Sequence, residues 1–239
     1  MCIRDSHDTS RPDGAPAQEF LRLQGIHKRF AGVHALRGID LTIHAGEIYH
    51  LLGENGCGKS TMIKIIAGAQ PPSEGEIFIQ GERVAELTPL ASLSLGIETV
   101  YQDLSLLPNM SVAENVALSA QLVRHQGRLA RLFDRGALND TAVRALRAVN
   151  LPATAAFLDT RVDELPIATR QLIAIARAIA TSARMVIMDE PTTSLTQKEV
   201  DALVKVINGL RANGVAVLFV SHKLDECFAI GGQAIVFRD

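Results

Sequence analysis

Residues 53–61 form a glycine-rich segment that limits the possible folds of this chain more than any other feature. Their sequence, Gly-Glu-Asn-Gly-Cys-Gly-Lys-Ser-Thr, fits the phosphate-loop pattern G-x-x-x-x-G-K-S/T. The apolar run at 48–52 before it predicts a strand, and the run at 61–67 after it predicts a helix. Because a phosphate-binding loop joins a strand to a helix, this context favours a polyphosphate site over an incidental glycine-rich turn.

The residue types in this segment suit the phosphates of a nucleotide. Glycines let backbone N–H groups close around a polyphosphate, and the helix N-terminus adds partial positive charge. Lys59 is expected to reach the β- and γ-phosphates, and the Ser60 hydroxyl to ligate Mg²⁺. Cys57 is interpreted as a small filler residue, and the alternative is an alkylation-sensitive thiol that ATP protects. The predicted nucleotide-binding residues of the loop are Gly53, Asn55, Gly56, Cys57, Gly58, Lys59, Ser60 and Thr61.

The composition is that of an ordinary globular protein. The chain has 239 residues, of which 47% are hydrophobic and 21% charged. The formal net charge of −2 gives no global field that would attract nucleic acid or an acidic membrane surface, so we expect no nucleic-acid partner. The sequence has no apolar run of the roughly 20 residues that span a bilayer, so any membrane role would be peripheral. Cys2, Cys57 and Cys227 show neither metal-ligand spacing nor a paired framework, which fits a reducing cytosol.

The first part of the chain divides into a polar head and a β-rich region. Residues 1–18 show no hydrophobic periodicity and are predicted to be disordered or non-native, which leaves 19–239 as the folded domain. Short runs of alternating polarity at 20–23, 39–43 and 77–79 predict antiparallel strands packed beside the phosphate-loop unit.

The second part changes from helical to β character. Residues from about 90 to 184 have apolar side chains three and four positions apart, which predicts a helical subdomain. Apolar runs at 185–188 and 215–220 then predict buried strands. Thr196 and Glu199 predict a capping box at the start of the helix between them. A strand–helix–strand order of this kind indicates a parallel crossover, and the chain is therefore expected to have an α/β fold.

Two carboxylates follow the buried run at 185–188 directly. Acidic side chains at the carboxyl end of a parallel strand lie where open α/β sheets bind ligands. Asp189 is expected to hold Mg²⁺, and Glu190 to polarise a water for attack on the γ-phosphate; the alternative is a strand end with solvated acids. Gln102 and His222 also end apolar runs, but spacing alone assigns neither a catalytic role.

An ordered set of motifs resembles a known family. The segments that carry the likeness are Lys28-Arg29-Phe30-Ala31-Gly32-Val33, Leu51–Gly56 leading into Lys59, Tyr101-Gln102-Asp103, Ser111–Val116, Glu190–Leu195 and Val220–Leu224. With these motifs, the chain from about Phe20 to its last residue resembles an ABC-transporter ATPase cassette. More narrowly, it is similar to the N-terminal cassette of the tandem ATPase subunits in bacterial monosaccharide importers of the ribose, xylose and galactose type. The resemblance implies a P-loop, RecA-like α/β core with an antiparallel β flank and a helical subdomain.

The resemblance implies roles that spacing does not. Phe30 matches the aromatic residue that stacks on adenine, with a core Phe at a strand end as the alternative. Gln102 matches the glutamine that contacts Mg²⁺ and the attacking water and that couples the helical subdomain to the permease. His222 matches the switch histidine at the γ-phosphate. Ser194-Leu195-Thr196 matches the loop across the dimer interface, which normally ends in Asp. The implied catalytic residues are Glu190, His222 and Gln102, and the implied metal ligands are Ser60, Gln102 and Asp189.

The signature segment departs most from the family pattern. ABC cassettes usually have Leu-Ser-Gly-Gly-Gln, where this chain has Leu165, Pro166, Ile167, Ala168 and Thr169. Pro166 offers neither a hydroxyl nor an N–H to a phosphate, and Ile167 and Ala168 crowd a place where glycines let the backbone approach. In the family, ATP is sandwiched between the phosphate loop of one cassette and the signature of the other. We therefore expect an asymmetric pair with one competent site, built on Lys59 and Glu190, unless the partner's signature is also weak.

The resemblance implies an ATP-hydrolysing subunit that energises uptake of a small solute, expected to be a monosaccharide. The implied cofactors are ATP and Mg²⁺. The implied partners are a second ABC cassette, transmembrane permease subunits and, indirectly, a periplasmic solute-binding protein, with the chain at the cytoplasmic face of the inner membrane. The chain is also expected to be a fragment of a longer two-cassette polypeptide.

Two other functions stay open at this point. The first is a soluble ABC ATPase acting on nucleic acid or ribosomes, which the absence of a Lys/Arg run in the sequence disfavours. The second is a non-hydrolysing ATP-binding regulatory subunit. The degenerate signature favours that function, and the acidic pair at 189–190 opposes it.

Overall fold

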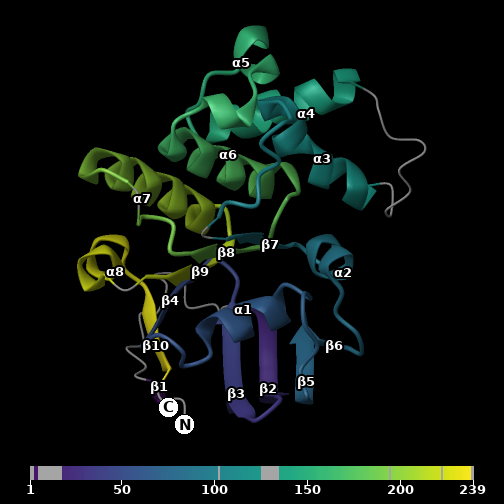
Figure 1. Ribbon diagram of the computed structural model, residues 1–239, viewed down its shortest axis with the longest axis vertical. Coiled ribbons are helices and arrows are strands. Elements are labelled where there is room, and N and C mark those ends of the chain that lie inside the picture. The colour runs from purple at the N-terminus through teal and green to yellow at the C-terminus, as the bar shows by residue number, and fades with distance from the viewer. Residues whose placement is uncertain are drawn as a thin grey trace.

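The computed structural model describes residues 3–4, 18–101, 103–124, 135–193, 195–221 and 223–237. Within these residues the strands form a six-stranded sheet and a four-stranded sheet, and Figure 1 shows the larger sheet between the smaller sheet and a group of helices. The larger sheet has the order β1-β10-β4-β9-β8-β7, with bounds β1 Ile3–Arg4, β10 Gln233–Phe237, β4 Ile48–Gly53, β9 Ala216–Val220, β8 Met185–Asp189 and β7 Ile97–Val100.

The larger sheet is parallel from β10 to β7, and β1 pairs with β10 in the antiparallel direction. Its central strands are hydrophobic on both faces, as expected for a parallel sheet covered on two sides. Val186 and Met188 belong to a core shared with the helices, whereas Met185 and Ile187 belong to a core shared with the smaller sheet. The predicted buried strands are therefore confirmed, and their alternate side chains serve two different cores.

The smaller sheet has the order β3-β2-β5-β6, with every neighbouring pair antiparallel. Its strands are β2 (Glu19–Phe30), β3 (Val33–His44), β5 (Glu74–Ile79) and β6 (Glu82–Val84). Helix α1 (Lys59–Ile66) packs its buried side chains, Met62, Ile63, Ile65 and Ile66, into the core that joins the two sheets. The predicted antiparallel strands beside the phosphate-loop unit are confirmed.

The helices lie mainly on the other face of the larger sheet. They are α2 (Pro89–Ser94), α3 (Val112–Arg124), α4 (Arg135–Ala148), α5 (Ala155–Asp159), the 3₁₀ helix η2 (Val162–Glu164), α6 (Ile167–Ala180), α7 (Gln197–Ala212) and α8 (Leu224–Ile230). Helix α7 connects the parallel neighbours β8 and β9, as predicted for the crossover. The predicted capping box at its start is present, with the Glu199 carboxylate accepting from the N–H and hydroxyl of Thr196.

Two boundaries differ from the expectation. The predicted helical range of about 90–184 contains β7, which is buried and pairs with β8, so that this strand interrupts the helices between α2 and α3. The four residues Ile97-Glu98-Thr99-Val100 are too few for their periodicity to distinguish a buried strand from part of a helix, and pairing with β8 identifies them as a strand. In the head, residues 3–4 form β1, and most of the rest of that segment lies outside the described residues.

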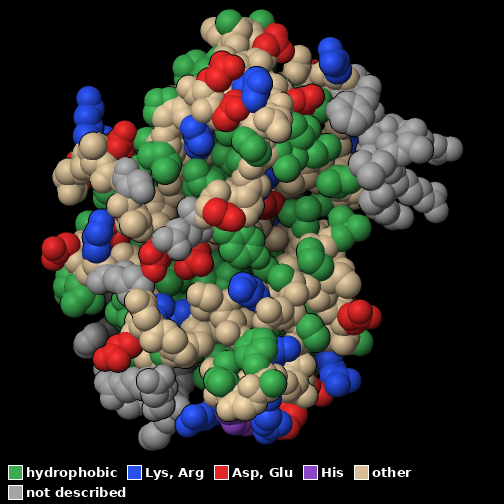
Figure 2. Space-filling view, viewed as in Figure 1, with side chains coloured by type: hydrophobic (Ala, Val, Ile, Leu, Met, Phe, Trp, Pro, Cys, Tyr) green, Lys and Arg blue, Asp and Glu red, His purple; other side chains and the backbone are tan. Residues whose placement is uncertain are grey.

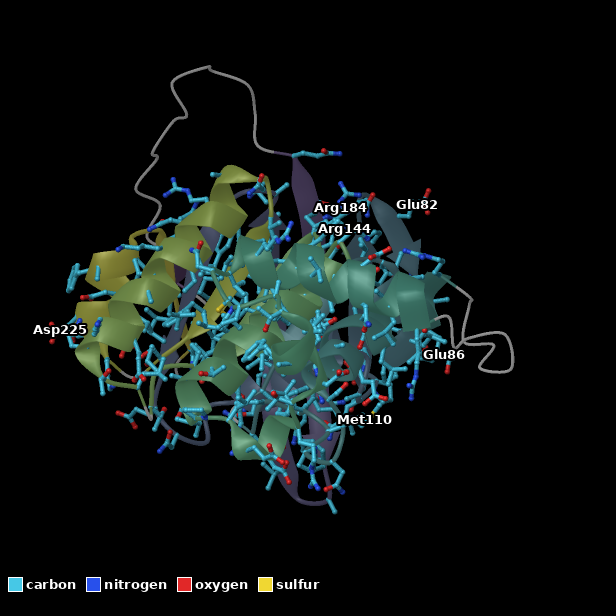
Figure 3. All side chains as sticks on the ribbon, turned by 90° about the horizontal axis from the view of Figure 1, so that it is seen from above. Glu82, Glu86, Met110, Arg144, Arg184 and Asp225 are labelled. Carbon is cyan, nitrogen blue, oxygen red and sulfur yellow. The ribbon has the colours of Figure 1, made fainter. Side chains whose placement is uncertain are left out.

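The surface carries charges of both signs. On the face shown in Figure 2, acidic and basic side chains are interspersed, and hydrophobic side chains gather along the helical layer. Seen from above (Figure 3), Asp225 of α8 and Glu82 of β6 lie at opposite edges of the molecule. Among the described residues, none of the helices has the length and apolar character needed to cross a membrane.

Candidate nucleotide site

The phosphate loop begins where β4 ends and finishes where α1 begins, as predicted. Gly58 has φ +98°, and a Cβ there would lie 2.6 Å from the carbonyl oxygen of Ala35 on β3. Gly53 has φ +153°, and a Cβ there would lie 2.7 Å from the carbonyl oxygen of Phe237 on β10. Side chains at these two positions would therefore force the loop away from both neighbouring strands. The loop keeps its shape because glycine lets the backbone pack this closely.

Lys59 holds the loop together from inside. Its buried ammonium donates hydrogen bonds to the carbonyl oxygens of Gly53 at 2.6 Å and Glu54 at 2.8 Å. The Cys57 thiol is also buried, with its Sγ 3.7 Å from Lys59 Nζ. The ammonium lies at the first turn of α1, whose leading N–H groups have no partner within the helix. Positive charge and backbone donors therefore point into the same small space, which suits a phosphate group.

Asp189 and Glu190 meet the phosphate loop in one pocket. The pocket has a volume of about 150 Å³ and is lined by Asn55, Gly56, Gly58, Lys59, Ser60, Thr61, Asp189 and Glu190. The acids reach it because β8 and β4 are parallel and end at the same edge of the sheet, with β9 between them. Six of the eight predicted loop residues and both predicted acids thus line one cavity, although they are separated by more than 120 positions in the sequence.

Glu190 has an unusual backbone. Its φ is +49°, in the left-handed region that side chains other than glycine rarely adopt, and its N–H donates to the carbonyl oxygen of Val220 at 2.9 Å. Such a conformation costs roughly 1–3 kcal/mol and occurs often at functional sites, where the surrounding structure maintains it. The conformation is a feature of Glu190 that the sequence motif does not reveal.

Phe30 lies outside this pocket, at the end of β2. Its ring is 45% exposed and lies beside the Lys28 ammonium, 5.3 Å from its centroid. The β2–β3 hairpin that carries Phe30 also carries Ala35, which contacts the loop at Gly58. A half-exposed ring on this hairpin contradicts the alternative of a core Phe, and adenine stacking by Phe30 stays a prediction.

The signature residues Leu165–Thr169 lie in the helical layer and do not line the pocket. Pro166 is exposed and is the N-cap of α6, and Ile167 is 48% exposed. Arg170 fixes the turn by donating to the carbonyl oxygens of Leu165 at 2.7 Å and Asp163 at 2.8 Å. The segment therefore presents an apolar surface at the start of α6. Three other predicted site residues, Gln102, Ser194 and His222, lie outside the described residues.

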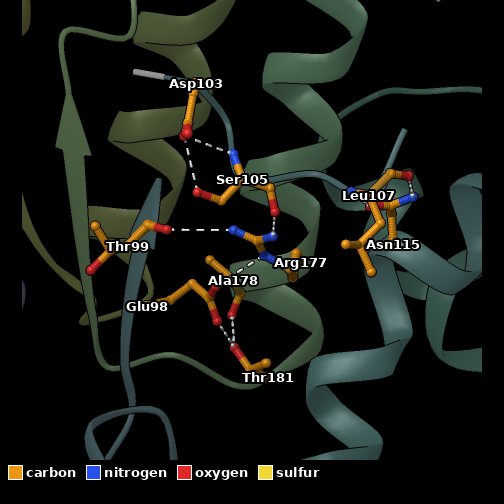
Figure 4. A network of polar contacts seen from close by, with 9 residues as sticks. All are labelled: Glu98, Thr99, Asp103, Ser105, Leu107, Asn115, Arg177, Ala178 and Thr181. Carbon is orange, nitrogen blue, oxygen red and sulfur yellow. Dashed lines mark hydrogen bonds and ion pairs between the residues drawn. The ribbon is translucent and has the colours of Figure 1, made fainter. Parts of the chain in front are cut away.

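A buried polar network that sequence reasoning missed joins the helical layer to the sheet (Figure 4). Arg177 of α6 pairs with Glu98 of β7 at 3.0 Å and donates to the carbonyl oxygens of Thr99 at 3.4 Å and Ser105 at 2.9 Å. Thr181 adds a hydrogen bond to the Glu98 carboxylate at 3.4 Å. Burial raises the pKa of Glu98, and the adjacent Arg177 opposes that rise. This network links the helix that begins at the signature with β7 and with the segment after position 102.

Replacing Lys59 with Met should weaken ATP binding by roughly 10- to 150-fold, since a hydrogen bond to a charged group contributes about 1.5–3 kcal/mol. The loop would also lose the ammonium that bonds two of its carbonyl groups. Equilibrium dialysis with labelled ATP would measure the change. Lys64→Met is the matched control because Lys64 is an exposed residue of the same helix. Equal affinity in the Lys59 variant and this control would contradict a phosphate-binding role for Lys59.

The fold and site together define a P-loop nucleotide-binding cassette with an added helical layer. The family model for ABC transporters matches residues 36–193, a range that includes the loop, helices α1 to α6 and the strand-end acids. The chain belongs to the ABC transporter family.

Curated relatives point to one branch of this family. The chain is 42% identical over 225 residues to the ribose import ATP-binding protein RbsA 2 of Burkholderia pseudomallei, which covers 94% of this chain and 43% of the relative. It is also 42% identical to the ribose import ATP-binding protein RbsA 1 of Streptomyces avermitilis, covering 93% of this chain and 41% of the relative. The chain thus spans less than half the length of these relatives.

Solved structures share the fold. The ADP conformation of MJ1267, an ATP-binding cassette of an ABC transporter, has a TM-score of 0.78 and 25% identity, covering 92% of this chain and 87% of that one. A dimeric post-hydrolysis structure of the cassette MJ0796 bound to ADP and phosphate has a TM-score of 0.76 and 25% identity, covering 91% and 94%.

Proposed function

We propose that this chain is the ATP-hydrolysing cassette of an ABC importer that takes up a monosaccharide. The observation that carries the proposal is the pocket in which Lys59 and the glycines of the phosphate loop face Asp189 and Glu190. The likeness to ribose import proteins supports the choice of a monosaccharide.

The residues present fit ATP and Mg²⁺. The glycine loop leaves open space at Gly56, where a Cβ would meet no atom within 4 Å, and the loop ends at the first turn of α1. Among the described residues, groups of three or more His, Cys, Asp or Glu side chains suited to a metal do not occur. Ser60 and Asp189 line one pocket, and with Gln102 they would hold Mg²⁺ together with phosphate and water oxygens, as is usual for this ion. When bound, Mg²⁺ would neutralise negative charge on the transferred phosphoryl group.

Each side chain of the site has a separate role in hydrolysis. Lys59 binds and orients the β- and γ-phosphates, because its ammonium lies where the loop and α1 meet. Glu190 accepts a hydrogen bond from the attacking water and polarises it toward the γ-phosphorus. By their match to the family motifs, Gln102 would contact Mg²⁺ and the attacking water, His222 the γ-phosphate, and Phe30 the adenine ring.

The signature segment makes the two sites of a cassette pair unequal. Pro166 offers no N–H, and Ile167 adds an exposed apolar side chain beside it. Neither residue suits the γ-phosphate that a partner cassette would bring to this segment. The site of this chain, completed by the signature of the second cassette, is the competent one. The other partners are permease subunits and, indirectly, a periplasmic solute-binding protein, with the cassette at the cytoplasmic face of the inner membrane.

The proposal is tested with the full-length protein reconstituted with its permease in proteoliposomes. We expect ATP hydrolysis that rises when ribose and the solute-binding protein are added, together with ribose accumulation in the vesicles. Xylose and galactose serve as comparison solutes. Hydrolysis without a response to any of these sugars would contradict a monosaccharide importer.

The second candidate function is an ATP-binding regulatory subunit that does not hydrolyse ATP. The observation that favours it is the exposed Pro166-Ile167 pair at the start of α6. Single-turnover assays on the complete cassette pair separate the two functions. Stoichiometric ATP binding with no release of phosphate would favour the regulatory function over the proposed one.

A further inference from the structure

Glu226 lies on α8, but its carboxylate is buried against the ends of two strands of the larger sheet. Its Oε2 accepts hydrogen bonds from Thr192 Oγ1 at 2.7 Å and from Ser221 Oγ at 2.7 Å. Its Oε1 lies 3.2 Å from the Lys223 ammonium. Thr192, Ser221 and Glu226 are only 2%, 4% and 7% exposed. A single buried carboxylate oxygen therefore joins hydroxyl groups from two different loops.

Those two loops carry residues predicted to act on ATP. Thr192 follows Glu190 by two positions in the loop after β8, and Ser221 directly precedes His222 in the loop after β9. A backbone hydrogen bond from Glu190 to Val220, at 2.9 Å, joins the same loops close to the strands. The carboxylate thus adds a second connection farther from the sheet.

The chemistry of the contact suits a residue that holds the two loops together, a role called fastening below. An ionised carboxylate only accepts hydrogen bonds, so it can hold two O–H donors at once, and bonds to a charged acceptor are stronger than neutral ones. Glu190 needs such support because its φ of +49° persists only where the surrounding structure maintains it.

We propose that Glu226 is a positioning residue that fastens the loop after β8 to the loop after β9, and so fixes Glu190 relative to the segment that contains His222. The effect of Glu226 on turnover rests on the proposed ATP hydrolysis at this site. The contact that joins the two loops does not depend on that hydrolysis. Asp225 provides the contrast, because it is an exposed acid in the same first turn of α8.

Hydrogen exchange of the full-length protein without nucleotide tests the fastening. In Glu226→Ala we expect amides of 190–196 and 220–223 to exchange at least roughly tenfold faster, while those of β4 stay unchanged. Asp225→Ala should match the unaltered protein. Glu226→Gln should change exchange less than Glu226→Ala, because its amide oxygen still accepts both hydroxyl groups. Unchanged exchange of both loops in Glu226→Ala would overturn the proposal.

Kinetics test the consequence for catalysis. Turnover of Glu226→Ala should fall by at least roughly tenfold with ADP affinity within about threefold, and Glu226→Gln should recover most of the turnover. A loss of turnover no larger than that of Asp225→Ala would overturn the positioning role. If the unaltered protein does not hydrolyse ATP, the proposed function fails, and hydrogen exchange still decides the fastening.

A second variant covers the case in which Glu226→Ala does not fold. The double substitution Thr192→Val and Ser221→Ala removes both donors and keeps the carboxylate with its Lys223 partner. It should give the same faster exchange of 190–196 and 220–223 as Glu226→Ala. Exchange equal to that of the unaltered protein would overturn the proposal.

Discussion

Replacing Glu190 with Gln should lower ATP turnover by at least roughly tenfold, and loss of a general base typically costs about 10²–10⁴-fold. ATP affinity should stay within about threefold, because Gln keeps the size and the hydrogen-bonding oxygen of Glu while losing its charge and basicity. Glu190 lines the pocket at the end of β8 without contributing to the loop that surrounds the phosphates. Steady-state phosphate release and equilibrium dialysis with labelled ATP give the two quantities.

Glu82→Gln is the matched control for this variant. Glu82 is an exposed residue of β6 that does not line the pocket, and its substitution should leave both turnover and affinity unaltered. A Glu190 variant with unchanged turnover would remove Glu190 from the catalytic role. A variant that loses turnover and ATP affinity equally would instead indicate that Glu190 serves mainly in binding.

The parts of this fold that the sequence predicts are those with a local signal. The phosphate loop has one because each glycine, Lys59 and Ser60 occupy fixed positions between a strand and a helix. The acids at 189–190 have a local signal because they directly follow the apolar run at 185–188, at the end of a predicted strand. The capping box at Thr196 depends on two residues three positions apart, and it is present.

The parts that sequence reasoning missed depend on contacts between distant residues. Arg177 and Glu98 are 79 positions apart, and each looks like an ordinary charged residue within an apolar segment. Thr192 and Glu226 are 34 positions apart, and only the adjacent ends of β8 and β9 bring them together. The one local signal is a charged residue inside an otherwise apolar helix. It predicts that the charge has a buried partner, but it does not identify which residue that partner is.

Replacing Arg177 with Met should lower the free energy of unfolding by about 3–5 kcal/mol near neutral pH, as is usual when one partner of a buried ion pair is removed. Glu98 would then be a buried carboxylate without its cation, and Ser105 and Thr99 would lose a donor to their carbonyl oxygens. Urea unfolding followed by circular dichroism would measure the change. Arg144→Met is the matched control, because Arg144 is an exposed arginine on helix α4 of the same layer, and it should stay within about 0.5 kcal/mol.

The loss in the Arg177 variant should depend on pH, with a sign that follows from Glu98. Burial raises the pKa of Glu98 in the folded state above its ordinary value of 4.5, and Arg177 opposes that rise. The folded protein therefore holds the Glu98 proton more tightly than the unfolded chain does, and this difference stabilises the fold fully at pH values below the ordinary pKa. The contribution is lost as the pH rises through the folded-state pKa. Without Arg177 the folded-state pKa of Glu98 lies higher still. The variant should therefore be least destabilised at about pH 5, and its loss of stability should grow as the pH rises toward about 7.5. Adding Glu98→Gln to the variant should remove this pH dependence, since the titrating group is then absent. A loss that stays constant with pH would contradict Glu98 as its origin, and the ion pair would then contribute through packing alone.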